Sequence, residues 1–249
     1  MRTKTALLIF ARTASEESKH KTFKASEALF DYQNKQVLKL AKTSGLDYFW
    51  IDEHKQRGEN FAHRYLNAIQ GVFDKGFEQV ISIGNDTPEL NLNHLQCAVK
   101  SLDCKDMCFG PSRDGGFYLW GVKKSFFNKE KYLHFSWKTK DLLSEILLYL
   151  EQQSFTVDCI STLMDLDYRE DAISLLQKSR LTFQIKVILF QILNQNQNNF
   201  THSSTEFITF SSSVYYNKGS PFGCLNQRKE PLTNYVIYIY EHQILLFFL

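Results

Sequence analysis

Proline and glycine are scarce in this sequence of 249 residues, which contains 4 prolines and 11 glycines. Such a low content excludes collagen-like repeats, elastic linkers and proline-rich disordered segments. An excess of charge of one sign is also missing, because 29 lysine and arginine residues are balanced by 27 aspartate and glutamate residues. A net charge of +2 creates no strong field for nucleic acid or for an anionic membrane, so we expect neither as a partner.

Paired cysteines and long apolar runs are absent as well. The five cysteines are odd in number and form no Cys-x-x-Cys motif, which indicates a reduced, cytoplasmic chain rather than a disulfide scaffold. The apolar run over residues 6–11 is interrupted at Arg12, and the apolar run over residues 235–249 is too short for a bilayer. We therefore expect no targeting signal and no membrane span, and nothing in the sequence indicates an oligomeric state.

The composition changes near residue 180. Residues 1–179 contain 48 charged residues, whereas residues 180–249 contain only 8. In this second segment, 24 of the 70 residues are Asn, Gln, Ser or Thr. The change predicts a main folded domain over residues 1–179 and a C-terminal appendage over residues 180–249, to which the sequence assigns no function.

Short apolar segments alternate with segments of helical periodicity in the main domain. Strands are predicted over residues 6–10, 48–51, 79–83, 107–109, 117–122 and 156–160, and helices over residues 23–44, 60–75, 93–102, 141–152 and 168–177. This alternation predicts βαβ units and an α/β three-layer sandwich with a mostly parallel, Rossmann-like sheet. Ligands bind such sheets at the carboxyl ends of the strands, so we expect the functional residues in the loops that follow them.

The loop after the first predicted strand is basic. It contains Arg12, Lys19 and Lys21 next to a helix start, which is compatible with binding of phosphate groups. It lacks the glycines of a dinucleotide fingerprint and the Gly-Lys-Ser/Thr of a P-loop. A solvated polar turn is the alternative interpretation.

A carboxylate follows the third predicted strand. Asn85 and Asp86 stand directly after a buried apolar run, and Gly84 would allow a ligand to approach closely. A carboxylate at this edge of a sheet can bind a hard cation that in turn holds phosphate oxygens. The alternative is that Asp86 only forms a turn before Pro88.

Two further loops contain candidate residues. Asp114, Gly115 and Gly116 precede an apolar strand, where the glycine N–H groups could face a ligand, or where Asp-Gly could form a simple hairpin turn. The number of residues between the predicted strands argues mildly against the simple turn. Asp167 follows the last predicted strand and forms an Asp-x-Asp pair with Asp165. A capping box made by Asp167 and Glu170 is the simpler interpretation, and a second metal ligand is the sharper one.

These loops resemble, in order, those of a bacterial family of unknown function within the glycosyltransferase-A superfamily, which has the nucleotide-diphospho-sugar transferase fold. The similar stretches are Leu8-Ile-Phe-Ala-Arg-Thr13, Lys19-His-Lys-Thr22, Phe61-Ala-His-Arg64, Ile83-Gly-Asn-Asp-Thr-Pro88, Gly110-Pro-Ser-Arg-Asp-Gly-Gly-Phe-Tyr-Leu119, Trp137-Lys-Thr139 and Leu163-Met-Asp-Leu-Asp167. The chain departs from the family at Phe23, where members have an arginine. The Asp86 loop is also similar to that of molybdenum-cofactor and phospholactate guanylyltransferases, in which the corresponding aspartate binds Mg²⁺.

The resemblance implies a metal-dependent glycosyltransferase with a nucleotide-sugar donor. Mg²⁺ or Mn²⁺ would bind Asp86 and Asp167, and Asp114 would be the catalytic residue. The substrate-binding candidates are Arg12, Lys19, Lys21, Arg64, Asn85, Gly115 and Gly116. A nucleotidyltransferase that takes a nucleoside triphosphate and releases pyrophosphate is the alternative, and a non-catalytic scaffold of the same fold is the second alternative.

Overall fold

The structure is a computed structural model that describes residues 4–21, 23, 25–177 and 181–193 with their side chains, and the backbone of residues 208–210, 235–240 and 243–248. The chain forms two compact units, Met1–Gln195 and Asn196–Leu249. Helix α8 (Phe183–Leu193) therefore belongs to the first unit, although the change in composition placed the boundary near residue 180.

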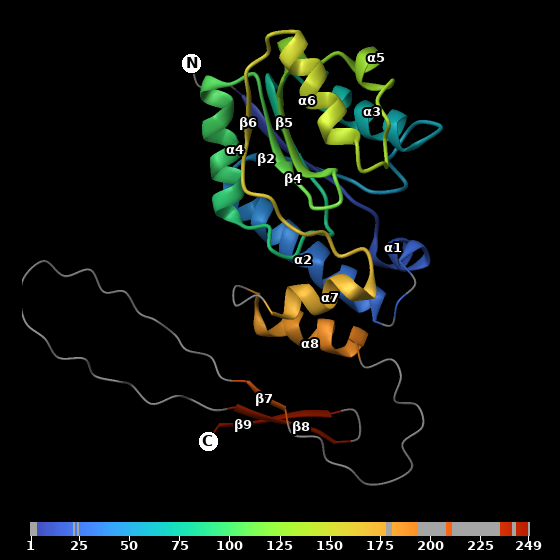
Figure 1. The fold of residues 1–249 in the computed structure, drawn as a ribbon, viewed down its shortest axis with the longest axis vertical. Coiled ribbons are helices and arrows are strands. Elements are labelled where there is room, and N and C mark those ends of the chain that lie inside the picture. The colour runs from blue at the N-terminus through green and yellow to red at the C-terminus, as the bar shows by residue number, and fades with distance from the viewer. Residues whose placement is uncertain are drawn as a thin grey trace, which may run out of the picture. The chain divides into compact units, whose positions relative to one another are not determined.

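A six-stranded sheet forms the centre of the first unit (Figure 1). Its strands are β1 (Thr5–Phe10), β2 (Asp47–Ile51), β3 (Gln79–Ile83), β4 (Met107–Pro111), β5 (Phe117–Lys123) and β6 (Val157–Cys159). The order is β2-β1-β3-β5-β4-β6, and β5 runs antiparallel to both of its neighbours while the other pairings are parallel. This confirms the predicted mostly parallel sheet.

Helices cover both faces of this sheet. The helical elements of the first unit are α1 (Ala14–His20), α2 (Ser26–Ser44), α3 (Phe61–Phe73), α4 (Leu92–Cys104), the 3₁₀ helix η1 (Lys124–Phe126), α5 (Lys129–Tyr132), α6 (Leu142–Gln152), α7 (Arg169–Leu176) and α8. Helices α2 and α4 lie on one face, and α3, α5 and α6 lie on the other (Figure 1). The predicted three-layer sandwich is thereby confirmed, and α1 is an additional helix inside the loop that follows β1.

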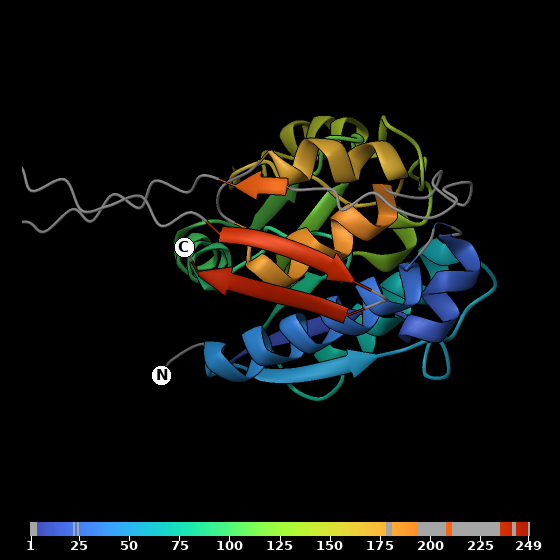
Figure 2. The ribbon, with the colours of Figure 1, turned by 90° about the horizontal axis from the view of Figure 1, so that it is seen from below.

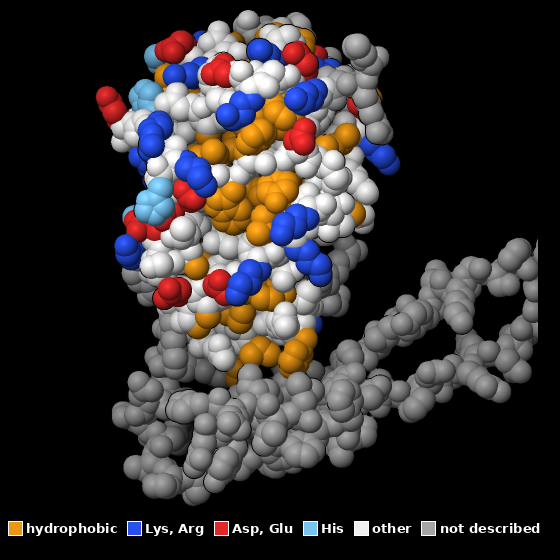
Figure 3. Space-filling view, turned by 180° about the vertical axis from the view of Figure 1, so that it is seen from behind, with side chains coloured by type: hydrophobic (Ala, Val, Ile, Leu, Met, Phe, Trp, Pro, Cys, Tyr) orange, Lys and Arg blue, Asp and Glu red, His pale blue; other side chains and the backbone are white. Residues whose placement is uncertain are grey.

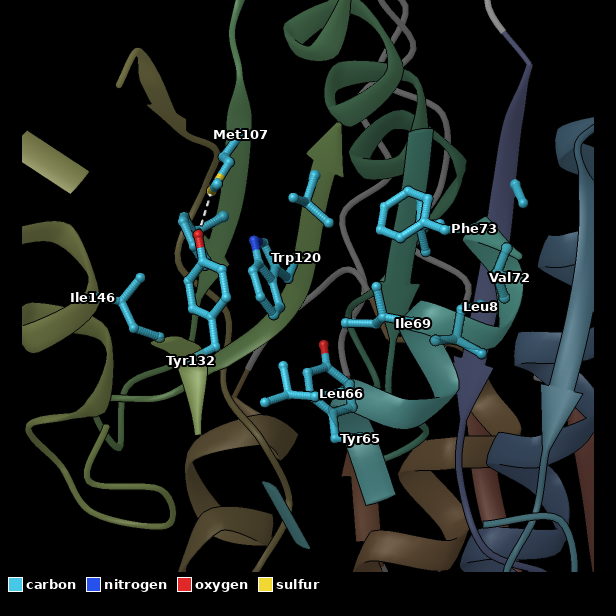
Figure 4. Close-up of a cluster of buried hydrophobic side chains, with 14 of the residues drawn as sticks. Leu8, Tyr65, Leu66, Ile69, Val72, Phe73, Met107, Trp120, Tyr132 and Ile146 are labelled. Carbon is cyan, nitrogen blue, oxygen red and sulfur yellow. Dashed lines mark hydrogen bonds between the residues drawn. The ribbon is translucent and has the colours of Figure 1, made fainter. Parts of the chain in front are cut away.

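Aromatic side chains fill the core between the sheet and the layer of α3, α5 and α6. Trp120 and Tyr132 are fully buried there, and the Tyr132 hydroxyl donates to Met107 Sδ at 3.4 Å (Figure 4). Leu66 and Ile69 come from α3, where helical spacing directs them to the same face. This core fixes the strands rigidly, so the loops at their carboxyl ends have defined positions.

A smaller third cluster lies where α7 and α8 pack side by side (Figures 1 and 2). Leu29 and Phe30 of α2 join Leu175 of α7 and Leu189 of α8, and all four side chains are fully buried. This packing explains why α8 belongs to the first unit. It also holds the loop that precedes α7 against the sheet.

The C-terminal unit contains a separate antiparallel sheet. Its strands are β7 (Ile208–Phe210), β8 (Tyr235–Tyr240) and β9 (Gln243–Phe248), in the order β7-β8-β9. This sheet lies in the appendage that the composition predicts.

Two features of the described residues concern membranes and surface charge. None of these helices combines the length and the apolar character that a bilayer crossing requires. Figure 3 shows lysine, arginine, aspartate and glutamate side chains interspersed among small apolar patches on one face of the molecule. Neither sign of charge dominates this face.

Candidate functional site

Three loops at the carboxyl edge of the sheet are joined by main-chain hydrogen bonds. Leu166 N donates to Asp86 O at 2.8 Å, which joins the loop after β6 to the loop after β3. Leu163 N donates to Pro111 O at 3.0 Å, which joins the same loop to the end of β4. The side chains carried by these loops are therefore brought close together, although their positions in the sequence are far apart.

Lys21 lies at the centre of this arrangement. The residue caps the C-terminus of α1, and its ammonium group lies 2.7 Å from Asp167 Oδ1 and 3.3 Å from Asp86 Oδ2. It also donates to Leu166 O at 3.4 Å and lies 3.8 Å from Glu17 Oε1. We call Lys21, Asp86, Asp165 and Asp167 the Lys21 centre; it unites the two predicted metal ligands with one predicted phosphate-binding residue.

The protonation of Lys21 is fixed by these carboxylates. Burial lowers the pKa of Lys21, but Asp86, Asp167 and Glu17 act in the opposite direction and leave the pKa above its usual range. For Asp167, burial outweighs the attraction of Lys21, so the pKa of this carboxyl is raised. One ammonium group therefore neutralises only part of the negative charge in the centre.

Asp165 shows the effect of this excess charge most clearly. Burial, followed by the charge of Asp86, raises the pKa of Asp165 to about 8, against a hydrogen bond from Thr87 Oγ1 at 2.5 Å. The nearby charges of Asp114 and Asp167 act in the same direction. Asp165 is therefore mostly protonated near neutral pH in this state, and the centre favours any ligand that adds positive charge.

The Asp167 side chain does not cap helix α7. The N–H groups of Asp167 and Tyr168 both donate to Asp171 Oδ2, at 3.1 and 2.8 Å, so Asp171 caps α7. The predicted capping box, which used Asp167 and Glu170, is wrong because the cap lies one residue further along. The Asp167 carboxylate instead forms an ion pair with Lys21.

Asp114 stands on a tight hairpin. Strand β4 extends to Pro111, beyond its predicted end, and pairs directly with the antiparallel β5. Asp114 Oδ1 accepts hydrogen bonds from Ser112 Oγ at 2.5 Å and from Gly116 N at 2.9 Å. The structure thus contains the hairpin turn that the sequence disfavoured. It fixes an exposed carboxylate whose charge acts on Asp165 and Asp167.

Gly115 is required by the turn itself. Its φ is +92°, and a Cβ at this position would lie 1.9 Å from Lys140 O. Its N–H donates to Ser112 O at 3.3 Å, so it is used within the hairpin, as is that of Gly116. We expect Gly115→Ala to destabilise the protein by about 1–3 kcal/mol. Urea unfolding would measure this change, and an unchanged midpoint would show that Lys140 moves freely.

The remaining predicted residues contact other parts of the chain. Arg12 forms an ion pair with buried Glu17 at 3.2 Å. Lys19 is exposed and pairs with Glu16, and the Arg64 guanidinium lies 3.5 Å from Glu59 O. The buried Asn85 donates to Asn34 Oδ1 at 2.7 Å. No contact within the described residues joins the side chains of Lys19, Arg64 or Asn85 to the Lys21 centre.

Sequence reasoning did not select Glu17 or Thr87. Glu17 stands four residues before Lys21 in α1, and the spacing alone could have indicated a helical pair had α1 been predicted. Thr87 stands directly after Asp86 and donates to Asp165. No local pattern reveals that contact, because 78 residues separate the two side chains.

Asp86 and Asp167 are the carboxylates of the Lys21 centre that a divalent cation could use. Within the described residues, no three His, Cys, Asp or Glu side chains form a group arranged to hold a metal ion. A cation nevertheless lies between Asp86 and Asp167, namely the Lys21 ammonium. Mg²⁺ is usually held by one or two protein carboxylates together with substrate phosphates. Two carboxylates that already share one cation fit this pattern.

One comparison with a solved structure supports the fold. A putatively assigned nucleotide-diphospho-sugar transferase from Desulfovibrio desulfuricans G20 has 18% identity and a TM-score of 0.65, with 76% of this chain and 98% of that chain covered. A cytidylyltransferase from Leptospira borgpetersenii has 17% identity and a TM-score of 0.41, with 81% of this chain and 100% of that chain covered. No curated protein matches the chain significantly.

A family described as "Uncharacterized protein conserved in bacteria (DUF2064)" matches residues 36–139. Asp86 and Asp114 lie within this segment, whereas Lys21 and Asp167 lie outside it. The family match and the structural similarity agree with the resemblance that the loops indicate. The chain therefore has a nucleotide-diphospho-sugar transferase fold and matches the model of this bacterial family over residues 36–139.

Proposed function

We propose that the chain is a divalent-cation-dependent glycosyltransferase that uses a nucleotide-sugar donor. The observation that carries this proposal is the Lys21 centre, in which Asp86 and Asp167 share one cation at the carboxyl edge of the sheet. Ligands of α/β sheets bind at this edge. The excess of carboxylates there suits a phosphate-bearing substrate only when a further cation accompanies it.

Asp86 and Asp167 are the residues that would hold Mg²⁺ or Mn²⁺. When bound, the cation would supply positive charge to the diphosphate that departs from the sugar. Both side chains are about one-third exposed, at 34% and 33%, so a ligand from solvent can reach them. Lys21 is 13% exposed, and its ammonium group is the counter-ion that these two carboxylates share.

We assign to Asp114 the role of base toward the acceptor. Its Oδ1 is occupied by Ser112 and Gly116, whereas no hydrogen bond within the described residues engages its Oδ2. In the proposed step, an acceptor hydroxyl oxygen bonds to the anomeric carbon, the bond from this carbon to the phosphate oxygen breaks, and Asp114 takes the hydroxyl proton. The nucleoside diphosphate departs with the bonding electron pair.

The contacts of the basic residues support sugar transfer over nucleotidyl transfer. A nucleoside triphosphate carries more negative charge than a nucleotide sugar and needs more cationic partners. Arg12, Lys19 and Lys21 were the predicted partners, and each forms an ion pair with a carboxylate of this chain. Their positive charge is therefore already largely compensated.

Thermal unfolding in the presence of nucleotides tests the proposal. We expect one of UDP, GDP, ADP or CDP to stabilise the protein in the presence of Mn²⁺, by about 2.7 kcal/mol at a hundredfold excess over its dissociation constant. The Asp86→Asn variant should lose this response, because it removes one carboxylate of the cation site. Asp103→Asn, at the exposed C-terminal end of α4, is the matched control and should retain it.

Three other outcomes would overturn the proposal. A larger response to a triphosphate than to the diphosphate would favour the nucleotidyltransferase. Thermal stabilisation by a nucleotide that needs no Mn²⁺ and persists in Asp86→Asn would show that the nucleotide does not bind at the Lys21 centre. No response to any nucleotide would leave a non-catalytic scaffold of the same fold.

A further inference from the structure

The ammonium group of Lys21 has no hydrogen-bonding capacity left for a substrate. Its three N–H donors match three acceptors of the protein, which are Asp167 Oδ1 at 2.7 Å, Asp86 Oδ2 at 3.3 Å and Leu166 O at 3.4 Å. The ring of Phe30 covers it at 5.0 Å from the centroid. In this arrangement Lys21 is a counter-ion of the protein, and it cannot also bind a phosphate group.

The same two carboxylates are needed for the proposed metal site. Asp86 and Asp167 can serve Lys21 or a divalent cation, but two cations held by both carboxylates would repel each other at short distance. The long Lys21 side chain can change position by rotation about its own bonds, without a change in the backbone. Lys21 must therefore release at least one carboxylate when a divalent cation binds, and it then needs another anion as partner.

We propose that Lys21 is an exchangeable counter-ion that couples cation binding to nucleotide binding. Without ligand, Lys21 holds Asp86 and Asp167 together and keeps the affinity for a divalent cation low. When the nucleotide arrives, Lys21 transfers its ion pair from these carboxylates to the diphosphate, and the carboxylates become available to the cation. The inference rests on the proposed function, since it concerns the order and cooperativity of binding at the same site.

Exchange of this kind has a thermodynamic signature. If the nucleotide raises the affinity for the cation, the cation must raise the affinity for the nucleotide by the same factor. Direct attraction between the cation and the diphosphate contributes to this factor, and the release of the carboxylates by Lys21 adds to it. Removal of the ammonium should therefore raise the affinity for the free cation and reduce the coupling. A Lys21 that only binds phosphate would instead leave the affinity for the free cation unchanged.

Calorimetric titration of the nucleotide-free protein with MnCl₂ provides the test. We expect Lys21→Met to bind Mn²⁺ at least about tenfold more tightly than the wild type, which is within the usual range of coupling between two sites. The control is Lys42→Met on the exposed side of α2, and it should match the wild type. The nucleoside diphosphate found by thermal unfolding should raise Mn²⁺ affinity by a larger factor in the wild type than in Lys21→Met.

Equal or weaker Mn²⁺ binding by a folded Lys21→Met variant would overturn the exchange. Nucleotide binding by the wild type would still stand in that case, so failure of this inference differs from failure of the proposed function. If Lys21→Met does not fold, amine labelling of wild-type Lys21 replaces it. Labelling should become faster when Mn²⁺ alone is added, and an unchanged rate would overturn the proposal.

Discussion

The wild-type protein is expected to lose stability as the pH rises from about 5.5 to about 9, and Asp165→Asn is expected to resist this loss. The pKa of Asp165 is raised to about 8 by burial and then by the charge of Asp86. Between the ordinary pKa of an aspartate and this value, the folded protein holds a proton that the unfolded chain has released. The free energy of unfolding therefore falls as pH rises through this window.

The expected loss is large. Each unit of pKa shift corresponds to ~1.4 kcal/mol, so about 2.5 units between pH 5.5 and pH 8 amount to roughly 3 kcal/mol. The raised pKa of Asp167 acts in the same direction. Lys21 has no effect in this window, because its raised pKa affects stability only at higher pH. Asparagine at position 165 stays neutral and keeps an oxygen for the hydrogen bond from Thr87.

Urea unfolding of both proteins at the two pH values, with a chelator present, would measure the effect. Asp103→Asn provides the control. This exposed residue lies at the C-terminal end of α4, whereas the Asp86 loop precedes the N-terminal end of the same helix. Parallel pH profiles for the wild type and Asp165→Asn would contradict the expectation. They would show that the carboxylates of the Lys21 centre share their protons differently or move apart at high pH.

The strands that form the centre of the sheet could be predicted because they are continuous apolar segments. Strands β1 and β3 are buried almost throughout, and a buried parallel strand has this composition. The position of Asp86 followed directly, since a polar residue after such a strand lies at the carboxyl edge. The class of sheet and one candidate ligand were therefore available from local sequence.

Helix α1 was not predicted because its sequence carries no apolar periodicity. The residues of α1 are Ala-Ser-Glu-Glu-Ser-Lys-His, and Glu17 is the buried one. Its burial depends on the ion pairs with Arg12 and Lys21, which no hydrophobic pattern reveals. The end of β4 was missed for a related reason: Gly110 and Pro111 have the composition of a loop, but they pair with β5.

The contacts of the Lys21 centre could not be predicted from spacing. Lys21 and Asp86 are 65 residues apart, and only the order of the strands places their loops side by side. The choice between Asp167 as cap and as ligand depended on a shift of one residue in the start of α7. Sequence patterns identify which residues reach an edge of the sheet; the packing of α1 and α7 decides which of them meet.

Asp114→Asn is expected to lower kcat for sugar transfer by about 10²–10⁴-fold while the affinity for the nucleotide diphosphate stays unchanged. Asparagine can keep the hydrogen bonds from Ser112 and Gly116 at its oxygen, so the hairpin should persist. It cannot take the proton of the acceptor hydroxyl. Release of nucleoside diphosphate from the donor, measured with and without acceptor, would determine kcat, and calorimetry would determine the affinity.

Asp86→Asn provides the contrast, because it should weaken nucleotide binding in the presence of Mn²⁺ before any chemistry takes place. If Asp114 took part in donor binding, Asp114→Asn would behave like Asp86→Asn. The affinity for the nucleotide and kcat/KM would then fall together in both variants. A purely structural role would lower the melting temperature of Asp114→Asn and leave kcat of the folded fraction intact. Only a loss of kcat at constant affinity and stability assigns the proton transfer to Asp114, since the hairpin then holds the carboxylate where the acceptor, rather than the donor, requires it.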